Sequence, residues 1–376
     1  MRKPRAKKFR VLVAPCAFKE SLSPRGAAEA LRRGWQRGFP GCAFVICPLA
    51  DGGDGTLETL VPDRKNWTTQ RVAGPRGKPI RAAWGRRDRG RTAVIEMARA
   101  SGLALLKPAE RRVLKASTFG TGELIRRALD AGCRKIWVGL GGSATCDGGA
   151  GMAQSLGYRF LDCDRREITH PIGGGDLIRI ESIEPPERTR FGDAEIIALC
   201  DVTNPLLGAE GTARVFAPQK GANRHEVRLL EKNLLHFARL VEDTFGPRGL
   251  SVQPFTGAAG GLAFGLAAFL RARLVSGSEF IARALGLPKL ASSSDVILTG
   301  EGAVEAQTLR GKGPLLIAHL GRAMRLPVIC FCGRLDSTLT RRLHREGFTA
   351  FFPLAAGPRE AKASRRNAAL RLELAA

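Results

Sequence analysis

The sequence predicts an α/β protein with a Rossmann-like parallel sheet domain built from discontinuous segments, and a second α/β domain inserted into it. Two observations lead to this prediction. Short, non-alternating apolar runs, typical of buried parallel strands, recur along the chain and alternate with helical patterns. The chain also has 376 residues and a hydrophobic content of 44%, which is enough for two domains that each have a core.

Six apolar runs are predicted as strands. They are residues 9–14, 44–49, 135–140, 295–299, 327–331 and 350–353. Helical patterns lie between them, and several end at a glycine, where helices commonly stop. These patterns cover residues 24–38, 122–131, 148–156 and 313–324. The alternation predicts a doubly wound sheet that contains all six strands.

The rest of the chain has a different pattern. Residues 67–97 contain short strand-like pieces, and residues 158–290 mix loops, strands and a long helix from 225 to 245. We therefore assign the segments 1–64, 116–157 and 291–376 to the Rossmann-like domain. The segments 65–115 and 158–290 are assigned to the second α/β domain. The active site is expected in the cleft between the two domains, because clefts of this kind commonly hold ligands.

The charge balance narrows the classes of partner. The sequence has 60 Lys and Arg against 35 Asp and Glu, a net charge of +25, which would suit nucleic acid, an anionic membrane or phosphorylated small molecules. The basic residues are spread along the whole chain and only 6% of residues are aromatic, so we expect no nucleic acid partner.

Hydrophobicity and cysteine spacing narrow the classes further. No apolar run reaches the roughly 20 residues of a membrane helix, and no signal-peptide pattern is evident, so we expect a cytoplasmic protein without a membrane partner. The nine cysteines include no Cys-x-x-Cys pair, which argues against disulfides and structural zinc. A homodimer is left open.

The chemically distinctive segments follow predicted strands. In open α/β sheets, ligands bind beyond the carboxyl ends of the strands. The segments there are Pro-Cys-Ala-Phe-Lys-Glu-Ser from residue 15, Ala-Asp-Gly-Gly-Asp-Gly-Thr from residue 50, the glycine-rich stretch 139–149, and Gly-Glu-Gly from residue 300. Glycines in the loop from 141 to 145 would let backbone amides approach a phosphate. The sequence therefore predicts one acidic, glycine-lined site.

Two segments of the second domain could face the same cleft. One combines residues 200–205 with 219–221, and the other is the small-residue run 257–261. Structural alternatives stand beside the functional interpretation. Asp51 could form an Asx-turn, Asp147 could cap a helix, and Lys220 could be one more surface cation.

These motifs resemble the two-domain glycerate kinase family over about residues 10–357. The motifs that carry the resemblance are Phe18-Lys19, residues 21–23, 50–56, 117–122, 141–145, 147–152, 200–201, 204–206, 218–221, 259–262, 299–302, Gln307-Thr308 and Gly311-Lys312.

The resemblance implies phosphoryl transfer from ATP and Mg²⁺ to D-glycerate, in this branch of the family usually at the carbon 2 hydroxyl, giving 2-phosphoglycerate. Such transfer needs positioning and charge neutralisation more than covalent chemistry.

The resemblance also implies roles for individual residues. The catalytic candidates are Lys19, Asp51, Asp147, Asp201 and Glu301, with Asp51, Asp147 and Asp201 as magnesium ligands. The nucleotide and phosphate candidates are Gly141, Gly142, Ser143, Ala144, Thr145, Lys220 and Lys312. The substrate candidates are Phe18, Gly52, Gly53, Asp54, Asn204, Glu305 and Gln307.

The sequence departs from the family pattern at several site positions. Cys16 and Glu20 stand where relatives carry Asp and Gly, Cys146 replaces Asn, and Ala303 replaces Arg. Since a carboxylate and a cation are missing, one alternative is a catalytically altered relative that phosphorylates another small hydroxy acid or only binds ligand.

A second alternative is a nicotinamide cofactor. Gly139-x-Gly141-x-x-Ala144 fits a dinucleotide fingerprint, with Asp162 further along the chain. A dinucleotide helix begins inside its fingerprint, whereas Gly148-Gly149 would interrupt a helix here, so the pattern disfavours this alternative.

Overall fold

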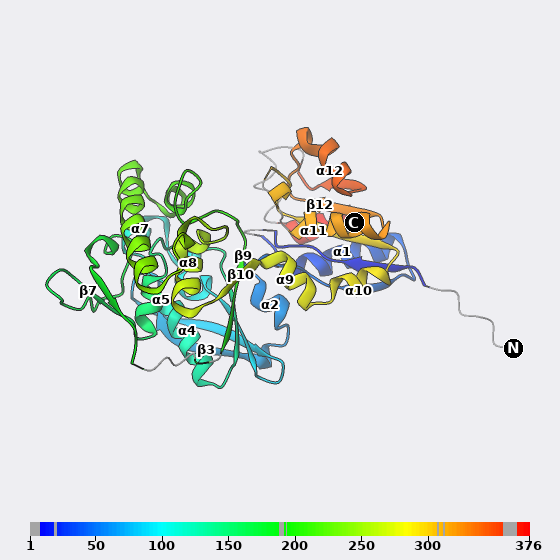
Figure 1. The fold of residues 1–376 in the computed structure, drawn as a ribbon. Coiled ribbons are helices and arrows are strands. Elements are labelled where there is room, and N and C mark those ends of the chain that lie inside the picture. The colour runs from blue at the N-terminus through cyan, green and yellow to red at the C-terminus, as the bar shows by residue number, and fades with distance from the viewer. Residues whose placement is uncertain are drawn as a thin grey trace. The chain divides into compact units, whose positions relative to one another are not determined.

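The computed structural model describes residues 8–18, 21–187, 192, 194–306, 308–310, 313–355 and 367–376 (Figure 1). The chain forms two compact units. Unit 1 contains Met1–Asp51, Glu58–Leu60 and Ser278–Ala376, and unit 2 contains Gly52–Leu57 and Val61–Gly277. The α/β fold class is confirmed, because unit 1 is assembled from separate chain segments and unit 2 is inserted between them.

Unit 1 is built on a five-stranded sheet in which every strand is parallel to its neighbours. The order is β13 (Ala350–Pro353), β12 (Val328–Cys332), β11 (Val296–Glu301), β1 (Arg10–Val13) and β2 (Ala43–Ile46). Neighbouring residues of β1 point to opposite faces, so Leu12 and Val11 enter different hydrophobic clusters. Both faces of this sheet are therefore covered.

Helices cover the two faces of this sheet. Buried side chains of α9 (Gly277–Ala284), α10 (Leu287–Ser292), α11 (Gly313–Met324) and α12 (Thr340–Glu346) join the cluster of Leu12. Those of α1 (Pro24–Gly38) and α14 (Ala368–Ala375) join the cluster of Val11. Helix α1 starts where the Ser23 hydroxyl accepts a hydrogen bond from Gly26 N–H at 3.1 Å. The doubly wound arrangement follows from these two layers.

Unit 2 is built on a six-stranded mixed sheet. The order is β10 (Arg273–Ser276), β9 (Glu195–Cys200), β6 (Lys135–Gly139), β5 (Thr92–Glu96), β4 (Pro79–Arg87) and β3 (Trp67–Ala73). The first four strands are mutually parallel, whereas β4 and β3 are antiparallel to their neighbours. The carboxyl ends of β5, β6 and β9 consequently lie at one edge of the sheet.

The position of β6 corrects the division expected from the sequence. All six predicted strands exist, but β6 pairs with β5 and β9 in unit 2 rather than with the strands of unit 1. Residues 116–157 therefore belong to unit 2, while residues 278–290 belong to unit 1. The physical reason is that buried parallel strands have the same apolar composition, and nothing in that composition specifies the partner strand.

The longest helix in the described part of unit 2 is α7 (Arg224–Phe245), which begins with a capping box formed by Asn223 and Glu226. The others are α2 (Thr56–Leu60, shared with unit 1), α3 (Ala98–Ser101), α4 (Phe119–Asp130), α5 (Ala150–Ser155), α6 (Thr212–Phe216) and α8 (Ala258–Leu270). None of the helices in the described part of the chain is long and apolar enough to cross a membrane.

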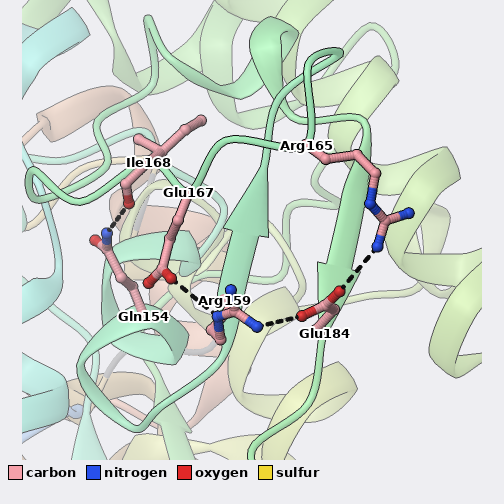
Figure 2. A network of polar contacts seen from close by, with 6 residues as sticks. All are labelled: Gln154, Arg159, Arg165, Glu167, Ile168 and Glu184. Carbon is pink, nitrogen blue, oxygen red and sulfur yellow. Dashed lines mark hydrogen bonds and ion pairs between the residues drawn. The ribbon is translucent and has the colours of Figure 1, made fainter.

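A two-stranded ribbon of β7 (Arg159–Leu161) and β8 (Ser182–Glu184) lies outside the main sheet of unit 2. Figure 2 shows its surface ion pairs: the Arg159 guanidinium contacts Glu167 at 2.9 Å and Glu184 at 2.6 Å. Beneath them Phe160 is fully buried and packs against Phe237 and Phe269. The ribbon is thus anchored by aromatic packing, because exposed ion pairs contribute little.

Candidate active site

The loop that follows β6 is held in place at the carboxyl edge of the six-stranded sheet. Gly141 N–H donates to Gly52 O at 3.1 Å. On its other side, Ala144 N–H donates to Ser101 O at 2.9 Å. The predicted phosphate loop, residues 141–145, is therefore fixed by backbone contacts from two separate chain segments.

Glycine is required in this loop because other atoms approach it closely. A Cβ at Gly141 would clash with Gly53 Cα and would lie 3.3 Å from Asp201 Oδ2. Gly142 is exposed and has a φ of 71°, a conformation that favours glycine. A Cβ at this position would lie 3.4 Å from Asp54 Oδ1. The geometry thus brings two of the predicted carboxylates, Asp54 and Asp201, beside the glycine loop.

The buried side chain of Lys220 contacts the same loop, residues 141–145. Its side chain is 3% exposed, which excludes the surface-cation alternative. The ammonium donates to Ser143 Oγ and to Thr145 O, both at 2.7 Å. Because a buried ammonium needs acceptors, these bonds fix the conformation of the loop and place a positive charge behind it.

The small-residue run that begins at Gly257 packs against this loop. Gly148 N–H donates to Gly260 O at 3.1 Å, and the Thr145 hydroxyl donates to Ala259 O at 3.4 Å. Ala259, Gly260 and Gly261 all have positive φ. Since a Cβ at Gly260 would clash with Thr145 O, the small residues here allow two backbones to meet.

Asp147 has the structural role that the sequence left open. The carboxylate is fully buried and accepts hydrogen bonds from the Thr118 N–H and hydroxyl, both at 2.7 Å, and from Gly149 N–H and Gly151 N–H at 3.3 Å. These contacts cap the amino ends of α4 and α5. Burial raises the pKa of Asp147, and the hydrogen bonds oppose the rise. This geometry disfavours Asp147 as a magnesium ligand, because both oxygens already accept hydrogen bonds.

Glu96, at the carboxyl end of β5, is a carboxylate near this loop that the sequence analysis did not find. Its Oε1 accepts from Leu57 N–H at 2.7 Å, and its Oε2 accepts from Arg99 Nε at 2.5 Å. Burial raises its pKa, Arg99 lowers it, and the nearby Asp54 charge adds to the rise. The residue ends an apolar strand, so no motif pointed to it.

The remaining candidates of unit 2 shape the surrounding loops. Gly52 has a φ of 100°, and a Cβ there would clash with Leu199 O, so glycine is needed for this turn. The Asn204 amide donates to Glu210 O at 2.8 Å and braces its own loop. That contact gives Asn204 a structural role in the described arrangement.

The candidates of unit 1 lie at the end of a strand or in the segments that follow the strands. Glu301 ends β11, is 7% exposed and accepts from the Thr308 hydroxyl at 2.6 Å. Glu305 forms an exposed ion pair with Arg334 at 3.3 Å. Asp51 is half-buried. Phe18 is 2% exposed and belongs to a hydrophobic cluster, which favours a core role over contact with substrate.

Several predicted residues cannot be placed. Lys19, Gln307 and Lys312 lie outside the described residues, and so does Glu20. Of the other departures, Cys146 is fully buried in the core of unit 2, whereas Cys16 and Ala303 are half-buried. The Cys146 sulfur accepts a contact from Lys220 Nζ at 4.0 Å, so this replacement lies next to the buried ammonium behind the loop.

The magnesium assignment can be tested against the donor set. Within the described ranges, no three His, Cys, Asp or Glu side chains gather so that they could hold a metal ion. Magnesium in kinases, however, is commonly held by one or two carboxylates together with substrate phosphates. Asp54 and Asp201 beside the glycine loop fit that requirement, and Asp147 does not.

The dinucleotide alternative does not fit the structure. Helix α5 starts at Ala150, after the fingerprint rather than inside it. Asp162 follows β7, which pairs only with β8 among the described strands, and its carboxylate accepts from Asp164 N–H and Arg166 N–H in a turn. Asp162 is therefore not at the end of a strand adjacent to β6, where the fingerprint requires its acidic residue.

The chain is similar in sequence to known proteins over most of its length. The sequence profile described as the glycerate kinase family matches residues 11–376. A glycerate kinase of Bacillus subtilis is 41% identical over 352 residues, which cover 93% of this chain and 91% of that protein. A glycerate 2-kinase of Escherichia coli is 40% identical over 354 residues, covering 92% and 90%.

A solved structure agrees as well. The crystal structure of a protein assigned as glycerate kinase 2 from Salmonella typhimurium LT2 is 37% identical and superposes with a TM-score of 0.82, covering 98% of this chain and 96% of that one. The fold, together with the loops at its strand ends, is that of a two-unit α/β kinase. The chain belongs to the glycerate kinase family.

Proposed function

We propose that the protein transfers the terminal phosphoryl group of ATP to the carbon 2 hydroxyl of D-glycerate, with Mg²⁺, and forms 2-phosphoglycerate. The observation that carries this proposal is the glycine loop of residues 141–145, with two carboxylates beside it and a buried ammonium behind it. The similarity to a glycerate 2-kinase supports the choice of hydroxyl. The cytoplasmic location and the homodimer stay predictions.

In the proposed reaction, the exposed glycine amide of the loop and the charge of Lys220 hold the nucleotide phosphates. Asp54 and Asp201 would hold magnesium, which when bound would neutralise part of the phosphate charge. One of the site carboxylates accepts the proton that leaves the glycerate hydroxyl as that oxygen bonds to phosphorus and the bridging oxygen departs with ADP.

The altered-catalysis alternative depends on Cys16 and Ala303, which stand where relatives carry Asp and Arg. The Cys16 sulfur lies where a Cβ at Gly313, the first residue of α11, would clash with it. A carboxylate at position 16 would therefore stand at the positive end of a helix, so its loss removes a charge from a defined place.

The test is a coupled assay of Mg²⁺-ATP and D-glycerate with Asp201→Asn and Asp54→Asn. If these carboxylates hold magnesium, kcat/KM should fall about 100- to 1,000-fold, as when one transition-state contact is removed. The matched control is Asp243→Asn, an exposed carboxylate paired with Arg248 at the surface of α7, which should change activity less than about twofold. Unchanged activity of Asp201→Asn would contradict the proposal.

A second experiment tests the altered-catalysis alternative. Cys16→Asp combined with Ala303→Arg restores the family residues. A wild-type protein without activity on D-glycerate that gains it in this double variant would support altered catalysis over the proposed activity.

A further inference from the structure

A basic hollow lies at the amino edge of the six-stranded sheet of unit 2. Its volume is about 710 Å³, and it is lined by Asp88, Arg89, Arg91, Thr92, Arg134, Lys135 and Glu195. Thr92, Lys135 and Glu195 are the first residues of β5, β6 and β9 and are aligned across the sheet. The glycine loop follows the opposite ends of these strands, about 13 Å away along five residues. The hollow is therefore separate from the candidate active site.

The carboxylates in and around this hollow are already neutralised. Glu195 contacts Lys135 Nζ at 3.2 Å and Arg273 Nη2 at 3.6 Å. Asp88 contacts Arg87 Nε at 3.4 Å, and its other oxygen accepts from the Thr92 hydroxyl at 2.8 Å. Both acidic residues thus have their own partners and leave the other cations of the hollow uncompensated.

Three guanidinium groups consequently face the hollow without an acidic partner. Within the described residues, Arg89, Arg91 and Arg134 have no carboxylate within ion-pair distance. All three side chains are exposed, so a ligand can reach them from solvent. Like charges held together repel one another, and an anion that binds between them would relieve this repulsion.

The backbone under these arginines is preorganised. Arg91 O accepts from Arg134 N–H at 2.9 Å and from Lys135 N–H at 3.2 Å. The Cys133 thiol donates to Gly90 O at 3.3 Å. These bonds tie the turn between β4 and β5 to the start of β6, so the two arginine-bearing segments keep a fixed separation and binding costs little ordering of the backbone.

We propose that this hollow is a binding site for a small molecule that carries two or more phosphate groups. A guanidinium presents a planar set of donors that matches the oxygens of a phosphate, and three of them exceed what a single phosphate can use in bidentate contacts. The volume lies within the roughly 300–1,000 Å³ of small-molecule sites. A nucleic acid is disfavoured because no aromatic side chain lines the hollow for base stacking.

The test uses inorganic pyrophosphate as the probe and the full-length protein. Calorimetry measures its affinity for the wild type and for the triple variant Arg89→Ala, Arg91→Ala, Arg134→Ala. Backbone NMR of Gly90 then reports whether the probe binds at this hollow or elsewhere. We expect saturable binding that shifts the Gly90 signal, with a loss of about tenfold per arginine removed, the value of one charge-assisted hydrogen bond.

A control variant removes the same charge from another surface of unit 2. Arg165→Ala, Arg166→Ala, Arg248→Ala lowers the net charge by three at sites where the arginines are exposed and paired with carboxylates. It should leave pyrophosphate affinity within about twofold. Thermal unfolding of both variants checks that they are folded.

Three outcomes would overturn the proposal. One is an unchanged Gly90 signal at saturating pyrophosphate. Another is an equal loss of affinity in both triple variants, which would mean attraction by net charge alone. The third is tighter binding of a 20-nucleotide single-stranded DNA than of pyrophosphate, with the same dependence on the three arginines, which would make the hollow a nucleic-acid surface. Because single Arg134→Gln keeps a polar side chain, it repeats the test with minimal perturbation of the turn.

Discussion

At the scale of single residues, polar groups around the glycine loop divide into those that hold the loop and those beside its exposed surface. Lys220 and Asp147 are buried and spend their hydrogen bonds on backbone and hydroxyl groups of the protein. Asp54 is exposed and Asp201 half-buried, both next to glycines. Residue type alone did not separate these roles, because a capping Asp and a magnesium-binding Asp look the same in a sequence.

Gly260 gives the sharpest prediction at this scale. Gly260→Ala should destabilise the fold by the roughly 1–2 kcal/mol of a left-handed alanine and by about 1–3 kcal/mol more for the clash with Thr145 O. Gly286→Ala is the matched control, since its φ is 68° but nothing lies within 4 Å of the added Cβ. Urea unfolding of both variants measures the difference, and equal losses would show that the contact with the loop is unimportant.

At the scale of elements, the ribbon of β7 and β8 has ion pairs at its surface (Figure 2) and a buried aromatic side chain, Phe160. Phe160→Ala should cost about 3–5 kcal/mol, because a fully buried ring leaves a cavity among aromatic neighbours. Arg159→Ala should cost less than about 1 kcal/mol, because the side chain is 53% exposed. Chemical denaturation checks both values. A larger loss for Arg159→Ala than for Phe160→Ala would reverse this interpretation of the ribbon.

The end of α7 gives a prediction about pH. Burial by itself would raise the pKa of Glu242, but hydrogen bonds from Ser251 N–H at 2.7 Å and Gly249 N–H at 3.1 Å outweigh it and lower the pKa below its ordinary 4.5. Because the pKa is lower in the folded state, the ionised carboxylate stabilises the fold at any pH above the pKa of the unfolded state. This stabilisation is lost as the pH falls through the pKa of the folded state.

The melting temperature of the wild type should therefore fall more steeply between about pH 5 and pH 3 than that of Glu242→Gln. Glu226→Gln provides a comparison in the same helix, since it keeps the size of an N3 side chain at the other end of α7. Parallel pH curves for the wild type and Glu242→Gln would contradict the assignment of acid sensitivity to Glu242.

At the scale of the whole molecule, local sequence patterns predicted where helices and strands lie but not which strands pair with one another. Helices α1 and α11 occupy the predicted residues, because proline, glycine and a serine cap mark their ends. Strand β6 was located correctly but placed in the wrong sheet, since apolar strands carry no label for their neighbours. Contacts across the sequence also explain why Glu96 was missed: it accepts a hydrogen bond from Leu57 of α2, which lies 39 residues away.

The candidate site followed the same rule. The sequence predicted that the segments after residues 14, 49, 140 and 299 share one site. Of these, the structure brings residues 52–54 beside the loop of residues 141–145, together with Asp201. The sequence left the capping role of Asp147 open and did not predict the buried position of Lys220, because both depend on the internal hydrogen bonds at the carboxyl edge of the unit 2 sheet. Asp147 contacts Thr118, which is 29 residues away, and Lys220 contacts Thr145, which is 75 residues away.

The most direct measurement is NMR of the products formed from D-glycerate, ATP and Mg²⁺ by the purified wild-type protein. The proposed function predicts sustained turnover with phosphorus attached at carbon 2, giving 2-phosphoglycerate and ADP in equal amounts. Formation of 3-phosphoglycerate would contradict the choice of hydroxyl. Absence of any phosphoglycerate while ATP still binds would contradict the proposed activity itself.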